Sequence, residues 1–449
     1  MVPGKRSIDP SLAAGFKDYL PRDMVPRQRI VDTIRSVFER FGFAPLDTPG
    51  LEREEVLTGG DPNFQMKIFR SRLREEDEGL ALRFDLTVPL ARVVSLYPDQ
   101  IAKPFKRYQV GKVWRGEKPQ AGRYREFVQF DADIVGSSRT MADAEIIALI
   151  YETMVALGLS RFLIRVNNRK VLNGLAMSIG FDQERTTDVL RIIDKLESHG
   201  WDNVSGELAE KIGLNSNQLS KLKQFLDLSA DNPSNLLVEL ATIMGNQAGA
   251  SEGMRELAEI TQHLEALNVP SKNWVIDLSV ARGLGYYTGP VFETVLTDLP
   301  SIGSVFSGGR FDALVERFGG PSIPATGASI GVDRLFSAME KLDLLPEGET
   351  VTQVLILNFN PEAEFECERI AHSLRVAGFC TEIYLGKEVT ISGQMAYAVR
   401  QGIPITILIG EREKARGTCQ IKDMIRRVQV ECVYYGALEK VREIIAEAD

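Results

Sequence analysis

The stretch Lys103–Gly136 decides the fold and reads KPFKRYQVGKVWRGEKPQAGRYREFVQFDADIVG. Its middle part, Glu117–Gly122, holds the proline and glycine that favour a loop between strands, so the stretch predicts a hairpin of two strands. On the return strand one face carries Val128, Phe130, Ala132 and Ile134, and the other carries Phe127, Gln129, Asp131 and Asp133. The second face is too polar for a packed interior without partners, so we interpret it as the floor of a site.

The same hairpin is locally basic. The 449-residue chain has a formal net charge of −9, which argues against broad nonspecific affinity for nucleic acid. Within 103–125, however, Glu117 is the one acid, and the basic residues are Lys103, Lys106, Arg107, Lys112, Arg115, Lys118, Arg123 and Arg125. A basic stripe on an acidic protein suits a specific polyanion, although a solvated charged hairpin remains an alternative.

Composition indicates a globular protein. The length predicts about three domains, and contents of 44% apolar and 26% charged residues are ordinary for a chain with a sizeable core. The first residues contain no apolar stretch of the signal-peptide type, and no run of about 18 apolar residues occurs. We therefore expect a cytoplasmic protein that does not associate with membranes.

The cysteines and histidines do not form a metal-binding pattern. The cysteines are Cys367, Cys380, Cys419 and Cys432, and they contain no Cys-x-x-Cys pair. We expect buried reduced thiols rather than a zinc site. The histidines, His199, His263 and His372, lie outside the segments rich in glycine and arginine, which argues against a histidine base or a histidine-bound metal.

Apolar periodicity predicts the remaining organisation of the first 300 residues. Residues 28–41 carry apolar side chains at helical spacing, and residues 43–49 read as an extended segment because proline disfavours helix before it. From about 170 to 267, leucine, isoleucine and charged residues recur with helical spacing, which predicts a helical insertion between two halves of a sheet domain. Strand character returns at 274–280 and 291–296.

The last hundred residues predict a separate small α/β domain. A linker-like segment, 343–351, precedes an alternation of strands and helices. The strands are expected at 354–359, 381–385 and 405–409, and the helices at 363–377 and 393–402.

Four groups of residues combine arginine, glycine and acidic residues in patterns that suit ligand binding or catalysis. They are Arg83–Thr87, Arg115–Arg125, Ala281–Gly289, and Gly308–Asp312 followed by Gly327–Leu335. Each alone is also explained by turns and packing. None is a P-loop or a dinucleotide-binding fingerprint, so a nucleotide would have to be held by fixed guanidinium groups, which suit charge on transferring phosphates.

Together these segments resemble known sequence motifs. The hairpin with Arg115, Gln129 and Asp133 resembles motif 2 of class II aminoacyl-tRNA synthetases, Gly327–Leu335 resembles motif 3, and the segment around Pro49 resembles motif 1. Arg282–Tyr287 is similar to the signature peptide of the histidyl-tRNA synthetase family. With the start at 15–21, the resemblance covers essentially the whole chain in the right order.

The resemblance implies an α/β and α+β multidomain fold: a class II antiparallel-sheet catalytic core with a helical insertion, and a C-terminal α/β anticodon-binding domain. The core is expected in two parts, 1–168 and 268–341, separated by the insertion at 169–267, with the last domain at 351–449. Motif 1 implies a homodimer.

The resemblance also implies the reaction. Histidine is activated with ATP to histidyl-adenylate and pyrophosphate, and is then transferred to the 3′ end of tRNA(His). Arg115 and Arg334 match the arginines that hold the ATP phosphates, and Glu117 matches the acid near the nucleotide. Arg282 matches the catalytic cation beside the α-phosphate and the histidine carboxylate, where negative charge develops. Mg²⁺ accompanies ATP in the family, and we find no separate metal motif.

A third set of matches concerns histidine and tRNA. Asp85, Thr87 and Gln129 match residues that bind the α-amino group. Asp133 and Tyr287 match the pair that reads the imidazole, because an acceptor and a hydroxyl complement its two nitrogens; Tyr286 and Arg282 complete the histidine-binding set. Gln120 and Arg125 are candidate readers of the tRNA acceptor end.

Two positions depart from the family pattern, and two other functions stay open. Gly285 replaces a usual aspartate and Phe311 a common tyrosine. The chain could instead be a noncatalytic regulatory subunit of ATP phosphoribosyltransferase in histidine biosynthesis, a paralogue with the same core fold. It could also be a pseudo-enzyme that only senses tRNA. The presence of Arg115, Arg282 and Arg334 argues against both.

Overall fold

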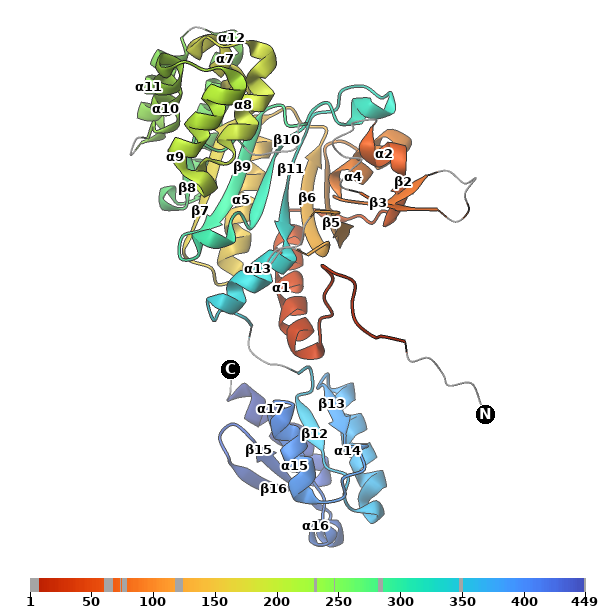
Figure 1. Cartoon of the computed structure of the whole chain (residues 1–449). Helices are drawn as coiled ribbons and strands as arrows, with labels where there is room; N and C mark the ends of the chain where they lie inside the picture. The colour runs from red at the N-terminus through yellow and green to blue at the C-terminus, as the bar shows by residue number, and fades with distance from the viewer. Residues whose placement is uncertain are drawn as a thin grey trace. The chain divides into compact units, whose positions relative to one another are not determined.

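The computed structural model describes residues 8–59, 68–72, 74, 79–117, 124–229, 232–245, 247–281, 286–346 and 350–447. The chain divides into two compact units (Figure 1). The first holds most of the chain up to Leu344, and the second holds Leu345 onward together with Asp18–Ile30.

The described part of the first unit is built on an eight-stranded sheet with the strand order β1-β5-β6-β11-β10-β9-β7-β8. Its strands are β1 (Ala44–Pro45), β5 (Phe105–Trp114), β6 (Glu126–Val135), β7 (Phe162–Asn168), β8 (Trp274–Ile276), β9 (Pro290–Leu296), β10 (Phe306–Arg310) and β11 (Ala325–Gly331). All pairings between β5 and β7 along this order are antiparallel, and the two outermost pairings are parallel.

The predicted hairpin is confirmed as β5 and β6, which pair from Phe105–Val135 to Trp114–Glu126. The apolar face of β6 is in the core, since Phe130, Ala132 and Ile134 are buried. The predicted helix at 28–41 is also confirmed, but α1 (Pro21–Arg40) begins earlier than expected, with a proline at its first position, where a missing N–H costs no hydrogen bond.

Helices and a small sheet flank the large sheet. The helix α5 (Thr140–Ala156) packs on β11, β10, β6 and β7 and is largely buried. A three-stranded sheet, absent from the sequence-based expectation, is formed by β2 (Leu51–Arg53), β4 (Leu80–Leu82) and β3 (Phe69–Ser71). Beside it lie α2 (Glu54–Thr58) and α4 (Thr87–Leu96), and α13 (Val332–Lys341) follows β11.

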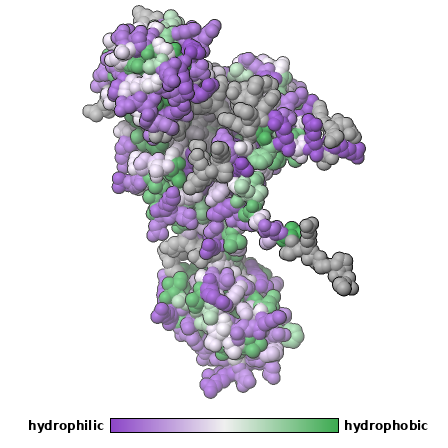
Figure 2. All heavy atoms as spheres, in the orientation of Figure 1, coloured by the Kyte–Doolittle hydropathy of each residue, from purple (hydrophilic) through white to green (hydrophobic). Residues whose placement is uncertain are grey.

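The segment expected to be helical is helical. Its helices are α6 (Arg169–Asn173), α7 (Leu175–Ile179), α8 (Thr186–Ile193), α9 (Leu196–Glu207), α10 (Ser216–Leu226), α11 (Pro233–Met244) and α12 (Ala248–Ala266), with a π-helical turn at Leu208–Ile212. The last helix, α12, packs against α5, α6 and β7, and so joins this segment to the large sheet. Hydrophilic residues predominate over these helices in Figure 2.

The second unit contains the predicted alternation of strands and helices. Its sheet has the order β13-β12-β14-β15-β16, from β12 (Val354–Ile356), β13 (Thr381–Ile383), β14 (Ile405–Leu408), β15 (Thr418–Asp423) and β16 (Gln429–Val433). The helices are α14 (Glu364–Val376), α15 (Ile391–Arg400), α16 (Glu411–Arg416) and α17 (Ala437–Ala446). The parallel pairs of β12 with β13 and β14 follow from the helical crossovers between them, whereas the antiparallel β15 and β16 were not predicted.

Short 3-10 turns complete the described elements. They are η1 (Gln183–Arg185), η3 (Ser271–Asn273), η4 (Pro300–Ile302), η5 (Val315–Phe318), η6 (Pro361–Ala363) and η7 (Tyr434–Gly436). Among the described helices, none is both long enough and apolar enough to cross a bilayer.

The expectation of buried thiols is correct for only part of the set. Cys367 and Cys419 are buried, Cys432 is half-buried, and Cys380 is exposed. Cys380 ends up exposed because it lies in the connection between α14 and β13 rather than on a core-facing position.

Candidate active site

Two adjoining cavities lie on the polar face of the large sheet. The inner cavity has a volume of about 340 Å³ and is lined by residues of β6, β9, β10 and β11, of the start of α4, and by the tyrosine pair. The outer cavity also has a volume of about 340 Å³. Both are bordered by the same six residues, Arg115, Gln129, Ser304, Ser307, Ser329 and Arg334, so they form one continuous depression.

The polar face of β6 forms the floor of the inner cavity, as the alternation predicts. Gln129, Asp131 and Asp133 all line it, with exposed fractions of 8%, 2% and 3%. Gly327 of β11 lies directly opposite Asp133 in the sheet. A Cβ at Gly327 would stand 2.0 Å from Asp133 Oδ1, so the carboxylate occupies space that only glycine leaves open.

A buried ion pair supports this floor. Arg107 of β5, fully shielded from solvent, places Nη2 2.6 Å from Asp133 Oδ2, and the same nitrogen donates to the Leu86 carbonyl at 3.2 Å. The interpretation of 103–125 as one basic stripe is therefore wrong for Arg107, because its guanidinium is buried and pairs with Asp133. The stripe is also less basic than expected at Lys106 and Lys112, since Lys106 pairs with Glu145 and Lys112 with Glu126. Successive side chains of a strand point to opposite faces of the sheet and therefore meet different partners.

The start of α4 contributes a second carboxylate. Asp85 is buried, and its Oδ1 accepts the backbone N–H of Val88 at 3.1 Å, which satisfies one of the free donors of the first helical turn. Its Oδ2 has no hydrogen-bond partner among the described residues. Thr87, the first residue of α4, also lines the inner cavity.

The carboxyl groups of Asp85, Asp131 and Asp133 all have raised pKa values. Burial raises the pKa of Asp85, the pKa of Asp131 to about 7 and the pKa of Asp133 to about 6, while the Arg107 guanidinium opposes the rise in each case. Several carboxylates beside one guanidinium give the cavity an excess of acceptors. A cation with several N–H donors would complement it.

The tyrosine pair closes the inner cavity. The rings of Tyr286 and Tyr287 meet edge to face at 5.1 Å, and Tyr286 meets Phe311 in the same way at 5.9 Å. Phe311, one of the two departures from the family pattern, is thus buried packing for Tyr286. Burial raises the pKa of both tyrosines, so they remain neutral hydroxyl groups near pH 7.

The outer cavity is lined by the predicted nucleotide-binding residues Arg115, Glu117 and Arg334. Arg115 Nε donates to the Phe84 carbonyl at 3.1 Å, and its guanidinium carbon lies 5.0 Å from the centre of the Phe127 ring. Arg334 Nη1 donates to the Ser304 carbonyl at 2.6 Å. Both guanidinium groups are anchored at one nitrogen, an arrangement that fixes positive charge at the border between the cavities.

Four positions singled out in the sequence are not among the described residues that line the cavities. Arg282, Gly285 and Gln120 lie outside the described residues. Arg125 is not part of either lining; its side chain donates to the carbonyls of Glu117 and Ala14 at 3.3 and 3.2 Å.

The sequence-based site set lacked three residues that the structure adds: Asp131 and Ser329, which line the inner cavity, and Arg107, which pairs with Asp133 beneath it. Gln129 Nε2 donates to Ser329 Oγ at 2.6 Å, and Ser329 lies opposite Asp131 in the sheet. The alternation along β6 already carried the signal for Asp131. Ser329 and Arg107 depend on strand pairing, which the sequence pattern does not reveal.

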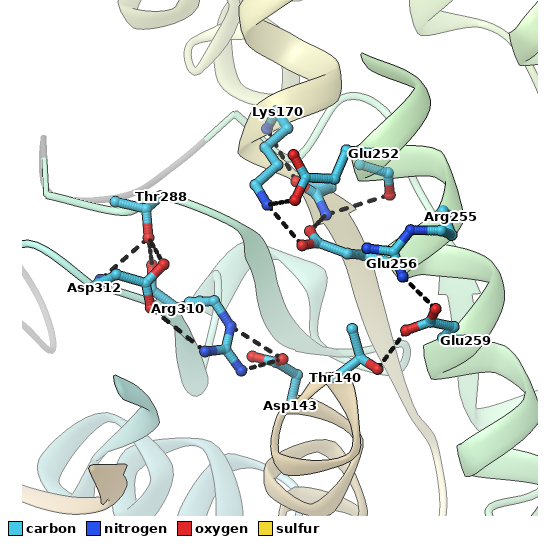
Figure 3. Close-up of polar contacts among 12 residues, drawn as sticks. Thr140, Asp143, Lys170, Glu252, Arg255, Glu256, Glu259, Thr288, Arg310 and Asp312 are labelled. Atoms are coloured by element: carbon cyan, nitrogen blue, oxygen red, sulfur yellow. Dashed lines mark hydrogen bonds and ion pairs between the residues drawn. The ribbon is translucent and has the colours of Figure 1, made fainter. Parts of the chain in front are cut away.

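A polar network anchors the segment that follows Tyr287 (Figure 3). Thr288 N–H donates to the Arg310 carbonyl at 2.9 Å, and Thr288 Oγ1 donates to Asp312 at 2.8 Å. Arg310 in turn contacts Asp143 of α5 at 2.6 Å, in a pair that solvent barely reaches. Thr140 of α5 donates to Glu259 of α12 at 2.7 Å, so hydrogen bonds link the tyrosine segment to the helical part of the unit.

The described residues contain no group of three or more histidine, cysteine or acidic side chains placed to hold a metal ion.

Comparisons with known proteins agree along the whole chain. The family profile described as histidyl-tRNA synthetase matches residues 15–335, and that of the anticodon binding domain matches residues 353–444. The histidine–tRNA ligase of Wolinella succinogenes is 41% identical over 440 residues and covers 98% of each chain. That of Helicobacter acinonychis is 40% identical over 447 residues, covering 98% of this chain and 99% of its own.

Solved structures show the same fold. The histidyl-tRNA synthetase of a Nostoc species superposes with a TM-score of 0.87 at 34% identity, covering 97% of this chain and 100% of its own. A Bacillus halodurans protein described as an ATP phosphoribosyltransferase regulatory subunit/histidyl-tRNA synthetase shares the fold alone, with a TM-score of 0.73 at 24% identity and coverage of 87% and 97%. The predicted class II core with a C-terminal α/β anticodon-binding domain is confirmed, and the chain belongs to the histidyl-tRNA synthetase family.

Proposed function

We propose that this protein is a histidine–tRNA ligase, which activates histidine with ATP to histidyl-adenylate and then transfers histidine to the 3′ end of tRNA(His). The observation that carries the proposal is the continuity of the two cavities: one has a carboxylate-rich floor for a cationic amino acid, and the next is lined by anchored guanidinium groups for a triphosphate. Full-length relatives named histidine–tRNA ligase support it.

The inner cavity is assigned to histidine. Asp85, Thr87 and Gln129 are assigned to the α-amino group, and Asp133 with Tyr287 to the two imidazole nitrogens, with Tyr286 packed behind. The buried Arg107–Asp133 pair supports an ionised acceptor at the ring subsite. A competing amino acid without ring N–H and N groups would leave buried polar partners unsatisfied, which discriminates strongly.

The outer cavity is assigned to ATP. Arg115 and Arg334 would bind the phosphates, Glu117 lies at the nucleotide, and Arg282 is proposed as the cation beside the α-phosphorus. The histidine carboxylate attacks that phosphorus, and fixed cations stabilise the negative charge that develops. Mg²⁺ bound through ATP phosphates needs only one or two carboxylates and water, a requirement that Glu117 fits.

The remaining assignments concern tRNA and assembly. We assign 351–449 as the anticodon-binding domain, 169–267 as the helical insertion, and 1–168 with 268–341 as the catalytic core. Arg125 and Gln120 are proposed to face the tRNA acceptor end. We further propose a cytoplasmic homodimer.

The regulatory-subunit alternative is not favoured. Arg115 and Arg334, which a noncatalytic paralogue has no need to retain, both line the outer cavity, and the C-terminal α/β unit is present. A tRNA-sensing pseudo-enzyme is disfavoured for the same reason.

The test is ATP–pyrophosphate exchange with purified protein, supplying each standard amino acid in turn. We expect exchange with histidine alone, because only histidine satisfies both ends of the inner cavity. Absence of exchange at millimolar histidine would refute the activity. Exchange supported equally by another amino acid would refute the assignment of the inner cavity.

A further inference from the structure

Asp131 has no part in the proposed function, although it lines the inner cavity. It occupies the floor between Gln129 and Asp133 on the same face of β6, about 7 Å along the strand from each. The α-amino group of histidine is assigned to one side of it and the imidazole to the other. A carboxylate at this position has to be explained, because an ionised acid without a cation is costly to bury.

We propose that Asp131 is a further substrate-binding residue that binds the α-ammonium group of histidine through Oδ1, together with Asp85 and Gln129. The inference rests on the proposed function and deepens it.

The first argument is the count of acceptors. Asp85 Oδ2, Gln129 Oε1 and Asp131 Oδ1 belong to buried cavity-lining residues and have no hydrogen-bond partner among the residues that the structure describes. An ammonium group has three N–H donors and no acceptor. Three acceptors without donors therefore match one ammonium.

The second argument is the orientation imposed by Ser329. Its hydroxyl accepts from Gln129 Nε2, which turns Gln129 Oε1 away from it and leaves that oxygen for a ligand. Asp131 lies opposite Ser329 in the β6–β11 pairing and bonds to the same hydroxyl. Asp131 and Gln129 are thus tied to one anchor, whereas Asp133 is tied to Arg107. This grouping assigns Asp131 to the ammonium end rather than to the imidazole end.

The third argument is charge. The groups that act electrostatically on Asp131 are Arg107 of β5, Asp133 of β6 and Asp85 before α4; Arg83, Tyr286 and Tyr287 also interact with it. Burial raises the pKa of Asp131 to about 7 in the absence of substrate, and the neighbouring acids add to the rise. A bound ammonium supplies the missing positive charge and lowers that pKa.

Histidine binding should consequently depend on pH in a defined direction. Below about pH 7 the Asp131 carboxyl of the free protein is largely protonated, and binding the ammonium has to expel that proton. Above that pH the carboxylate is already ionised. The KM for histidine is therefore expected to fall as pH rises from 6 to 8, and binding at pH 6.5 is expected to release protons.

The test compares the wild-type protein with Asp131→Asn, which keeps the size and the hydrogen bond to Ser329 but removes the charge. We expect its KM for histidine to rise about 10- to 100-fold at pH 8, as for loss of one charge-assisted hydrogen bond, with the KM for ATP little changed. We also expect the variant to lose the part of the pH dependence that is centred near pH 7, whereas the part that arises from Asp133 and Asp85 remains. A histidine analogue with a triazole ring in place of imidazole separates this effect from titration of the substrate.

Glu126→Gln is the matched control, because Glu126 is another carboxylate of β6 that lines neither cavity and pairs with Lys112. It should leave both KM values unchanged. Calorimetric titration of histidine in buffers of different ionisation enthalpy measures affinity and proton release without turnover, so it tests Asp131 even if the exchange assay fails. Wild-type affinity and proton release in Asp131→Asn would overturn the inference while leaving the ligase activity untouched.

Discussion

Arg107 Nη2 and Asp133 Oδ2 lie 2.6 Å apart in a position that solvent does not reach, directly beneath the inner cavity. Burial pushes the pKa of Asp133 up to about 6, and Arg107 is what prevents a larger rise. The carboxylate that faces the cavity is therefore mostly ionised at neutral pH. The acceptor that we propose for an imidazole N–H thus depends on a guanidinium on the neighbouring strand.

Replacement of Arg107 by methionine should damage both folding and substrate binding. Removing one member of a buried pair typically costs about 3–5 kcal/mol of unfolding free energy, because the remaining charge has no partner, although protonation of Asp133 will reduce that cost. We expect a lower urea midpoint and a higher KM for histidine.

Lys106→Met is the control for Arg107→Met, since Lys106 is the adjacent residue and its pair with Glu145 is partly exposed. Its unfolding free energy should change by less than about 1 kcal/mol. Equal stability of the two variants would contradict the role given to the buried pair.

Gly327→Ala should disturb histidine binding through a steric effect alone. The added methyl group would stand 2.0 Å from Asp133 Oδ1, so the carboxylate or the strand has to move. We expect a loss of about 1–3 kcal/mol in unfolding free energy and a raised KM for histidine. Gly331→Ala at the end of the same strand is the control, because its methyl group would meet Arg334 Cβ at an ordinary 3.8 Å. Similar KM values for histidine in both variants would argue against the requirement for glycine at 327.

Arg115→Ala should slow histidine activation by roughly 10²–10³, since it removes a preorganised cation from the border of the cavity that we assign to ATP. Arg282→Ala is expected to have an effect of the same size, with histidine affinity near normal. Single-turnover formation of the adenylate measures both. Arg125→Ala, outside both cavities, should leave activation unchanged and affect only transfer to tRNA. If Arg282→Ala instead loses histidine binding while its rate of histidine activation is unchanged, the catalytic role proposed for Arg282 is contradicted.

Thr288→Val should raise the KM for histidine several-fold with a loss of about 1 kcal/mol in unfolding free energy, because it removes the hydroxyl that fixes the segment after Tyr287 to Asp312. Ser322→Ala is the control: its hydroxyl contacts the backbone of the same Asp312 but lies at the surface. If both variants keep the wild-type KM, the network in Figure 3 supports the fold without positioning the tyrosines.

Removal of residues 351–449 should leave ATP–pyrophosphate exchange partly intact and depress charging of tRNA, because both cavities belong to the first unit. Exchange and charging measured on the same preparation separate the two steps. Unchanged charging would show that the last unit does not bind tRNA.

The sequence by itself determined the features that depend on local periodicity. Alternation along β6 placed Gln129, Asp131 and Asp133 on one polar face, and helical spacing located the helices between 169 and 266. Both follow from the geometry of a single strand or helix, which neighbouring residues suffice to reveal. The motif residues Arg115 and Arg334 were likewise identified from the sequence, and the structure brings them to one cavity.

Only the tertiary structure decided which side chains meet across strands. The sequence placed Arg107 in a basic stripe, but pairing of β5 with β6 buries it beneath Asp133. Likewise, β11 puts Gly327 opposite Asp133 and Ser329 opposite Asp131, although some 200 residues separate the members of each pair. Strand register is set by packing of the whole sheet, and so are burial and the pKa values that follow from it. No local pattern contains that information.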